Sequence, residues 1–194
     1  METYDKIFDW YYSSRSPDAG VEVTRLFTEN LQPAGKILDI GCGYGTPITS
    51  TLFHLGFKPY GIDSSINMVT KFKEELPGVP IECSDALNSD FFNTIFDAVI
   101  GYGFMFHLTP VQQNKVIDKV AEHLQQDGYF LFNSGDEDGS EMTLPGYNGG
   151  ESFMTHSMSC DNYEKVLQRN GMMLVNHYIE EGFGSTIYIA KKVF

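Results

Sequence analysis

Residues 36–47 read Lys36-Ile-Leu-Asp-Ile-Gly-Cys-Gly-Tyr-Gly-Thr-Pro47. The apolar run at the start, interrupted by Asp39 alone, is typical of a buried parallel strand. The three glycines predict a tight turn, because glycine adopts positive φ and lets a ligand approach the backbone closely. We expect Thr46 to cap the following helix and Pro47 to occupy its first position. A strand, a glycine turn and a helix in this order predict a ligand site beyond the end of the strand.

The spacing of the glycines bears on the kind of ligand. A dinucleotide-binding turn, G-x-G-x-x-G/A, would need a small third residue at position 46 if it began at Gly41, and Thr46 stands there. A carboxylate, Asp39, lies two residues before the first glycine. It would repel a pyrophosphate and suits a ligand that carries a cationic amine. From this stretch alone, an ordinary glycine-rich turn or a nucleotide-binding turn remains open.

The stretch resembles the first motif of the class I S-adenosylmethionine-dependent methyltransferases. In that family the carboxylate and the backbone of the turn hold the methionine part of S-adenosyl-L-methionine, which becomes S-adenosyl-L-homocysteine after transfer. The resemblance therefore implies this cofactor, with its methionine part held by Asp39, Gly41, Cys42, Gly43 and Gly45.

Two further carboxylates follow expected strands. The strand at residues 59–63 ends in Asp63, and the short strand at 79–83 runs into Ser84 and Asp85. The carboxyl ends of parallel strands meet at one edge of the sheet, so we expect both carboxylates beside the glycine turn. Each also fits a turn residue or a helix cap.

The family resemblance gives these residues roles at the nucleoside end of the cofactor. Asp63 would bind both ribose hydroxyls, as an acidic residue at the end of a second strand does in related folds. Ser64 and Met68 would lie against the adenine, although Met68 could equally be a core methionine. Asp85 and the backbone of Ala86 would bind the edge of the adenine ring.

The expected fourth strand, at residues 95–100, continues into Gly101-Tyr-Gly-Phe-Met-Phe-His107-Leu108. This segment resembles FDxVxxxxxxxHL of small-molecule methyltransferases. We expect Gly101 and Tyr102 at the cofactor, and Phe106 and His107 at the substrate. An unperturbed histidine has a pKa suited to a general base near neutrality, which makes His107 the candidate catalytic residue. Alternatively, its ring holds the loop through a backbone bond.

Two segments without motifs are expected to shape the substrate site. Residues 1–31 are rich in aromatic side chains and read as helices broken near 13–17; they resemble a flap, with Tyr11 and Arg15 reaching inward. Residues 134–159 form a long, glycine-rich insertion, with a short strand near Phe153. Within the insertion the expected substrate contacts are Tyr147 and His156. Alternatively, the N-terminal segment is a helix packed at the edge of the core, and residues 134–159 are a flexible surface loop.

The rest of the chain completes an α/β pattern. Helices are expected at 46–56, 111–126 and 161–170, and strands at 129–133, 172–179 and 186–191, the last two as an antiparallel hairpin. The methyltransferase resemblance implies a seven-stranded, mostly parallel sheet of order 3-2-1-4-5-7-6 with helices on both faces. Residues 1–194 would then form a single methyltransferase domain.

The composition of the chain limits the kinds of binding partner that we expect. The 194-residue chain carries a formal net charge of −13, which opposes binding to nucleic acid and to anionic membranes. Methyltransferases that act on exocyclic amines of DNA bases resemble one another in an (Asp/Asn/Ser)-Pro-Pro-(Tyr/Phe) motif directly after the fourth strand. Here residues 101–104 read Gly-Tyr-Gly-Phe, which argues against a nucleic-acid substrate. The three cysteines form no CxxC pair, so neither a metal site nor a disulfide framework is expected. The first residues lack a signal-peptide pattern, so we expect a cytoplasmic protein. We expect the protein to be a monomer or a homodimer.

These observations predict methyl transfer from S-adenosylmethionine to an oxygen or nitrogen of a small molecule. The sulfonium is already activated by its positive charge, so the protein mainly has to position the two reactants. Two alternatives stay open: a protein or peptide methyltransferase, and a non-catalytic domain that binds the cofactor.

Overall fold

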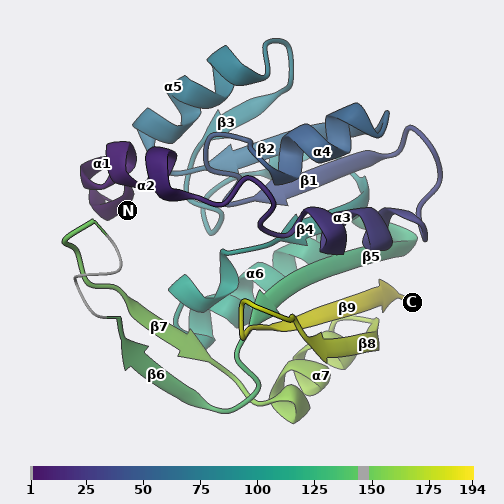
Figure 1. The fold of residues 1–194 in the computed structure, drawn as a ribbon. Helices are drawn as coiled ribbons and strands as arrows, with labels where there is room; N and C mark the ends of the chain where they lie inside the picture. The colour runs from purple at the N-terminus through teal and green to yellow at the C-terminus, as the bar shows by residue number, and fades with distance from the viewer. Residues whose placement is uncertain (1, 144–148) are drawn as a thin grey trace.

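The computed structural model describes residues 2–143 and 149–194, and its centre is a twisted sheet (Figure 1). The strand order is β3-β2-β1-β4-β5-β9-β8. Strands β1 to β5 pair in parallel, whereas β9 is antiparallel to β5 and to β8. The bounds are β1 Lys36–Ile40, β2 Lys58–Asp63, β3 Ile81–Cys83, β4 Phe96–Gly101, β5 Leu124–Ser134, β8 Met172–Ile179 and β9 Thr186–Lys192.

This sheet confirms the predicted α/β class and the antiparallel final hairpin. The strand numbers at the end differ from the predicted 7-6 because two strands outside the sheet take the labels β6 (Gly139–Met142) and β7 (Met154–Ser157). In the described part of the chain, no helix is long and apolar enough to cross a membrane.

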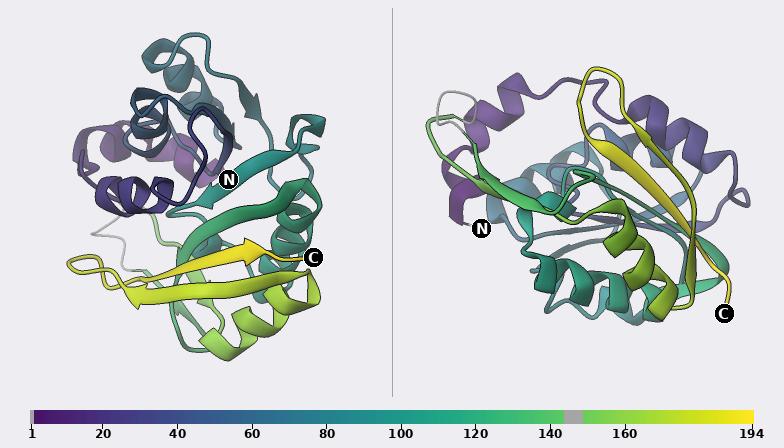
Figure 2. Two further views of the ribbon diagram at one scale, coloured as in Figure 1. Left: turned by 90° about the vertical axis from the view of Figure 1, so that its right-hand side faces the viewer. Right: turned by 90° about the horizontal axis from the view of Figure 1, so that it is seen from below.

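Helices cover both faces of the sheet (Figure 2). Ile37 of β1 packs with α3 and α4, while its neighbour Leu38 packs with α6 and α7 on the other face. This alternation follows from the two-residue period of a strand, and it explains why β1 is apolar on both sides. The helices are α3 Val21–Thr28, α4 Ile48–His54, α5 Ile66–Glu75, α6 Pro110–His123 and α7 Cys160–Arg169, with short 3₁₀ turns η1 Phe91–Asn93 and η2 Met105–His107.

Helix α6 begins with a capping box at Thr109, because the Thr109 hydroxyl accepts from Gln112 N–H and the Gln112 side chain accepts from Thr109 N–H. The predicted Thr46 cap is wrong. Helix α4 begins at Ile48 with Pro47 as its N-cap residue, since the first i to i+4 bond runs from Thr51 N–H to the Pro47 carbonyl, 3.0 Å.

The N-terminal segment divides into α1 (Glu2–Lys6) and α2 (Phe8–Ser14) before α3. The predicted break lies at Arg15, whose extended backbone (φ −64°, ψ 131°) ends α2. The break between α1 and α2 was not predicted. It falls at Ile7, which leaves the helical pattern and is buried in the core at 3% exposure.

Strands β6 and β7 form an antiparallel hairpin whose end lies beside α1 and α2 (Figures 1 and 2). The sequence predicted one short strand near Phe153, which corresponds to β7. It missed β6 because every residue of that strand is exposed, so no alternation of apolar and polar side chains marks it.

We expect Phe132→Ala to lower the free energy of unfolding by about 3–5 kcal/mol. Phe132 is fully buried in β5, where its ring packs on Phe130 and Tyr188 at 4.9 Å. Urea denaturation of the variant measures the loss. Phe194→Ala is the control, because Phe194 is 89% exposed; equal midpoints for the two variants would contradict the assignment of this core.

Candidate active site

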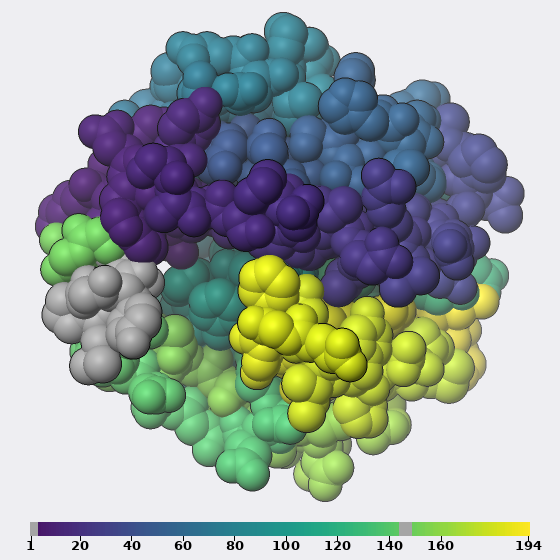
Figure 3. Space-filling view, viewed as in Figure 1, coloured from purple at the N-terminus to yellow at the C-terminus, as the bar shows by residue number. Residues whose placement is uncertain are grey.

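Two adjoining cavities open at the carboxyl ends of the central strands. The first has a volume of about 350 Å³ and the second about 460 Å³. They share five lining residues and therefore adjoin: Tyr4, Tyr11, Gly103, His107 and Phe153. Figure 3 shows the surface hollowed between the N-terminal segment (purple) and the C-terminal turn (yellow), with teal residues at the floor.

The first cavity gathers most of the residues expected at the cofactor. They come from the turn after β1, the end of β2 with the first turn of α5, the segment after β3 and the segment after β4. These lining residues are Gly41, Gly43, Asp63, Ser64, Met68, Asp85, Ala86 and Tyr102.

Four other expected cofactor residues do not line this cavity. Asp39 is 1% exposed and lies beneath the turn. A Cβ on Gly45 would lie 2.7 Å from Leu76, and one on Gly61 would lie 2.7 Å from the Cys42 sulfur, so Gly45 and Cys42 pack against the layer below. Gly101 faces Phe104. These residues support the cavity wall from behind.

The glycine turn is tied to the end of β2. The N–H groups of Gly41 and Cys42 both donate to the Ile62 carbonyl, at 2.8 and 3.1 Å. Gly41 has φ +72°, and a Cβ there would come within 2.7 Å of the Phe104 ring. Glycine is therefore required at this position both for its backbone conformation and for the close approach of Phe104.

Asp63 lies where the turn and α5 meet. One carboxylate oxygen accepts from Gly43 N–H at 2.8 Å, and the other accepts from Ser65 N–H at 2.9 Å. Burial raises the pKa of Asp63, although these backbone donors oppose the shift. Each oxygen of an ionised carboxylate has room for a second donor, so Asp63 can still bind hydroxyl groups in the cavity.

Asp39 is fully enclosed beneath the turn. Its carboxylate accepts a hydrogen bond from the Thr49 hydroxyl at 2.6 Å. Burial raises its pKa to about 7, while the Thr49 bond and the charge of Arg15 act in the opposite direction. A cation placed near the turn would restore the ionised form of this carboxylate.

The segment after β3 is held in place by α6. Asp85 accepts from Leu87 N–H at 2.8 Å, which closes a tight side-chain turn. The Lys119 ammonium donates to the carbonyls of Ala86 and Leu87 at 2.9 and 3.2 Å and to that of Ser89. The backbone at Asp85 and Ala86 is thereby fixed against the first cavity.

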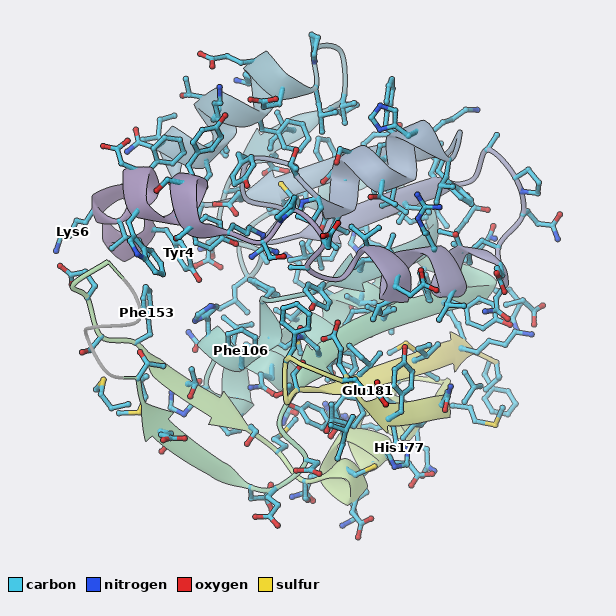
Figure 4. All side chains as sticks on the ribbon, viewed as in Figure 1. Tyr4, Lys6, Phe106, Phe153, His177 and Glu181 are labelled. Atoms are coloured by element: carbon cyan, nitrogen blue, oxygen red, sulfur yellow. The ribbon has the colours of Figure 1, made fainter. Side chains whose placement is uncertain are left out.

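Aromatic rings surround the junction of the two cavities. The Tyr4 hydroxyl and His107 Nε2 are 2.9 Å apart and share a hydrogen bond. The Phe153 ring lies 5.3 Å from that of Tyr4 and 5.7 Å from that of His107. Figure 4 shows Tyr4 and Phe153 facing one another, with Phe106 farther along the same opening.

The titration of these groups follows from their burial. Burial lowers the pKa of His107 to about 4, so its ring is neutral at pH 7. Burial raises the pKa of Tyr11 to about 12 and also raises that of Tyr4, so both phenols keep their protons. His107 is therefore a weak base in this site, and its ring bonds the Tyr4 hydroxyl rather than the backbone atom expected for a purely structural ring.

Four of the six residues expected at the substrate line the second cavity: Tyr11, Arg15, Phe106 and His107. Arg15 donates to the Tyr11 hydroxyl and is the one Lys or Arg side chain among the described residues that line either cavity. It can bind an anionic group of the acceptor or the carboxylate of the methionine part of a cofactor.

His156 lines neither cavity; its backbone carbonyl accepts from Gln113 Nε2 at 3.2 Å. Tyr147 lies outside the described residues. The sequence reasoning assigned no site role to Tyr4, Gly103 or Phe153, all of which line both cavities. Tyr4 and Phe153 lie in the aromatic N-terminal segment and the long insertion, and Gly103 lies in the segment after β4; these signals mark regions rather than single residues. Within residues 2–143 and 149–194, no group of three His, Cys, Asp or Glu side chains could hold a metal ion.

Comparisons with known proteins identify the family. A model of the methyltransferase domain matches residues 37–128. An uncharacterized methyltransferase of Bacillus mycoides is 32% identical over 160 residues, which are 75% of this chain and 74% of that protein. The chain belongs to the S-adenosylmethionine-dependent methyltransferases. Phosphoethanolamine N-methyltransferase 1 of Zea mays is 33% identical to this methyltransferase over 112 residues, 54% of the chain and 22% of the maize protein.

The chain spans between 22% and 59% of the length of three curated relatives: the maize enzyme, carboxy-S-adenosyl-L-methionine synthase of Campylobacter fetus and phosphoethanolamine N-methyltransferase of Plasmodium falciparum. Among solved structures, CalS10, an amino pentose methyltransferase from Micromonospora echinaspora, superposes with a TM-score of 0.74. The match covers 96% of this chain and 97% of CalS10 at 15% identity. This likeness confirms the class I methyltransferase fold.

We expect Asp39→Asn to change how stability depends on pH. Burial raises the folded-state pKa of Asp39 to about 7, well above the value of an exposed aspartate, about 3.9. The native state therefore binds more protons between these values, and Asp39 reduces stability as pH rises from about 4 to 7. Asn stays neutral, so the variant should gain stability relative to wild type across that range and keep the gain at pH 8. Urea midpoints from pH 4 to 8 measure this, and parallel curves for the two proteins would contradict it.

Proposed function

We propose that the chain transfers a methyl group from S-adenosylmethionine to an oxygen or nitrogen of a small molecule. The observation that carries this proposal is the pair of adjoining cavities. One has Asp63, Asp85 and a glycine turn on its walls, and the other is lined by seven aromatic rings, His107 included, together with Arg15 and mostly small or polar residues. Such a pair holds a cofactor and an acceptor side by side, which is the main requirement of the reaction.

When bound, the cofactor supplies a sulfonium methyl group that is electrophilic without further activation. The chain's own residues bind and orient it. Asp63 would accept hydrogen bonds from the ribose, and Ser64, Met68, Asp85 and Ala86 would enclose the adenine. The turn would hold the methionine end, supported by Asp39, Gly41, Cys42, Gly43 and Gly45, with Gly101 and Tyr102 nearest the methyl group.

Within this proposal, an amine nitrogen fits the site better than an alcohol oxygen. A neutral amine already presents its lone pair, whereas a hydroxyl group needs a strong base to become nucleophilic. The junction offers Tyr4 and Tyr11, which remain protonated, and His107, a weak base. The maize relative, named as a methyltransferase of an amine nitrogen, supports the same choice.

In this proposal, residues 1–194 form a single methyltransferase domain, and two of its segments cover the cavities. Residues 1–31 act as the flap and residues 134–159 as the insertion that shapes the acceptor site. The ring contact between Tyr4 and Phe153, 5.3 Å, joins the two over the junction. An acceptor site covered from both sides suits a small molecule better than a protein or a peptide.

The test is transfer of labelled methyl from S-adenosylmethionine into cell extract that has been separated by size. We expect label in the small-molecule fraction, with chemistry of an N-methyl product. Label in protein would favour the peptide alternative. Absence of label together with measured cofactor binding would favour a binding domain without catalysis.

Asp63→Ala should weaken the affinity for S-adenosylhomocysteine about 100-fold, because two hydroxyls would lose hydrogen bonds to a charged group. Isothermal titration calorimetry measures the change. Glu122→Ala removes a carboxylate from the exposed part of α6 and serves as the control, with affinity expected to match wild type. An Asp63→Ala protein that binds like wild type would overturn the assignment of the ribose site.

The Tyr4–His107 pair gives a further prediction. We propose that His107 orients the Tyr4 hydroxyl and that the two act as one unit. Tyr4→Phe and His107→Ala should each lower turnover about tenfold, and the double variant should lose little more, because residues in one hydrogen bond are not additive. Turnover is measured with the acceptor recovered by labelling. Losses that multiply to about 100-fold would show independent roles, as expected for a base at His107.

A further inference from the structure

Helix α1 is attached to the start of α5 through one carboxylate, that of Asp5. Its Oδ1 atom accepts from the Ser65 hydroxyl at 2.5 Å and from Asn67 N–H at 3.1 Å. The Asn67 side chain in turn donates to the Asp5 carbonyl at 3.2 Å. A carboxylate at a helix N-terminus is favoured by the free N–H groups and by the helix dipole.

The same serine belongs to the proposed cofactor site. Ser65 is the N-cap of α5, where its oxygen accepts from Met68 N–H at 3.2 Å. Its own N–H donates to Asp63. Asp5 and Asp63 therefore bind the hydroxyl and the backbone of one buried residue, which is 1% exposed. A displacement of either carboxylate would therefore move Ser65 and alter the hydrogen bond that Ser65 makes with the other carboxylate.

The rest of the α1–α2 segment is held mainly by ring contacts: the Tyr12 ring lies 5.0 Å from the Tyr44 ring and 5.0 Å from the Lys71 ammonium, and the Tyr4 ring lies 5.3 Å from that of Phe153. Helix α2 has no buried residue, and its recorded side-chain hydrogen bond to α5 is that from Tyr12 to Glu75, at 3.3 Å and exposed. Ile7 enters the core between the two helices. Tyr4 directly precedes Asp5, so the contact of Asp5 with α5 sets where the Tyr4 ring meets His107.

We propose that Asp5 is a positioning residue that latches the first two helices of the flap, residues 2–14, onto the cofactor site. Through Ser65, the latch couples cofactor binding at Asp63 to the placement of Tyr4 over the junction of the cavities. The inference rests on the proposed function, because it takes the first cavity as the cofactor site. Coupling of this kind is reciprocal: the cofactor favours the closed flap, and the closed flap strengthens cofactor binding.

The chain carries its own probe of the flap. Trp10 is the single tryptophan of the sequence, and it lies in α2 on the wall of the second cavity. It is 37% exposed, so quenching of its fluorescence by acrylamide can rise if the flap detaches. The measurement needs no knowledge of the acceptor.

The experiment compares wild type with Asp5→Ala and Asp5→Asn, using acrylamide quenching of Trp10 with and without S-adenosylhomocysteine. We expect stronger quenching in Asp5→Ala, and an intermediate value in Asp5→Asn, since its amide oxygen can still accept. S-adenosylhomocysteine should reduce quenching in wild type and have no such effect in Asp5→Ala. Its affinity, by calorimetry, should fall about fivefold or more in Asp5→Ala.

The matched control is Asp9→Asn, which removes an exposed carboxylate from the same flap and should behave as wild type. Asn67→Ala removes the bond to the Asp5 carbonyl and gives a second, milder test of the latch. Quenching in Asp5→Ala equal to that of wild type overturns the latch. If S-adenosylhomocysteine fails to bind wild type, the proposed function fails instead, and the quenching without ligand still decides whether Asp5 holds the flap.

Discussion

The hydrogen bond from Gly43 N–H to the Asp63 carboxylate, 2.8 Å, joins the two halves of the site. It links the glycine turn after β1 to the end of β2, and the Ser65 N–H on the other oxygen adds the start of α5. Three elements thus converge on one carboxylate whose pKa burial raises. Such a buried carboxylate does little for stability. Its place at the carboxyl edge of a parallel sheet explains it as part of a ligand site.

Much of this arrangement could be predicted because it is local in sequence and fixed by topology. The apolar runs gave the central strands, and parallel pairing brings the ends of successive strands to one edge. Asp63 and Asp85 therefore line one cavity although 22 residues separate them. The final hairpin was predictable for the same reason, since a short turn joins two apolar strands.

The features that could not be predicted depend on distant contacts or on exposed backbone. Tyr4 and His107 are 103 positions apart, and no periodicity reports that their side chains meet. Strand β6 is stabilised by its pairing with β7, while its side chains face solvent. At Thr46, the sequence offered a good capping residue, but helix α4 starts at Ile48 with Pro47 as its N-cap residue. The first two features depend on contacts between segments distant in the sequence, which local preference does not report.

The electrostatics of the site fit a ligand that arrives with a positive charge. Asp39 is fully buried and Asp63 partly buried, and burial raises the pKa of both carboxyl groups. Arg15 is the one Lys or Arg on the described cavity walls, and it is bonded to Tyr11. A cationic group near the glycine turn would favour the ionised form of Asp39, while Asp63 can still accept hydrogen bonds from hydroxyl groups. The neutral, aromatic junction then leaves the reaction to positioning, since its weakly basic His107 adds little proton transfer at pH 7.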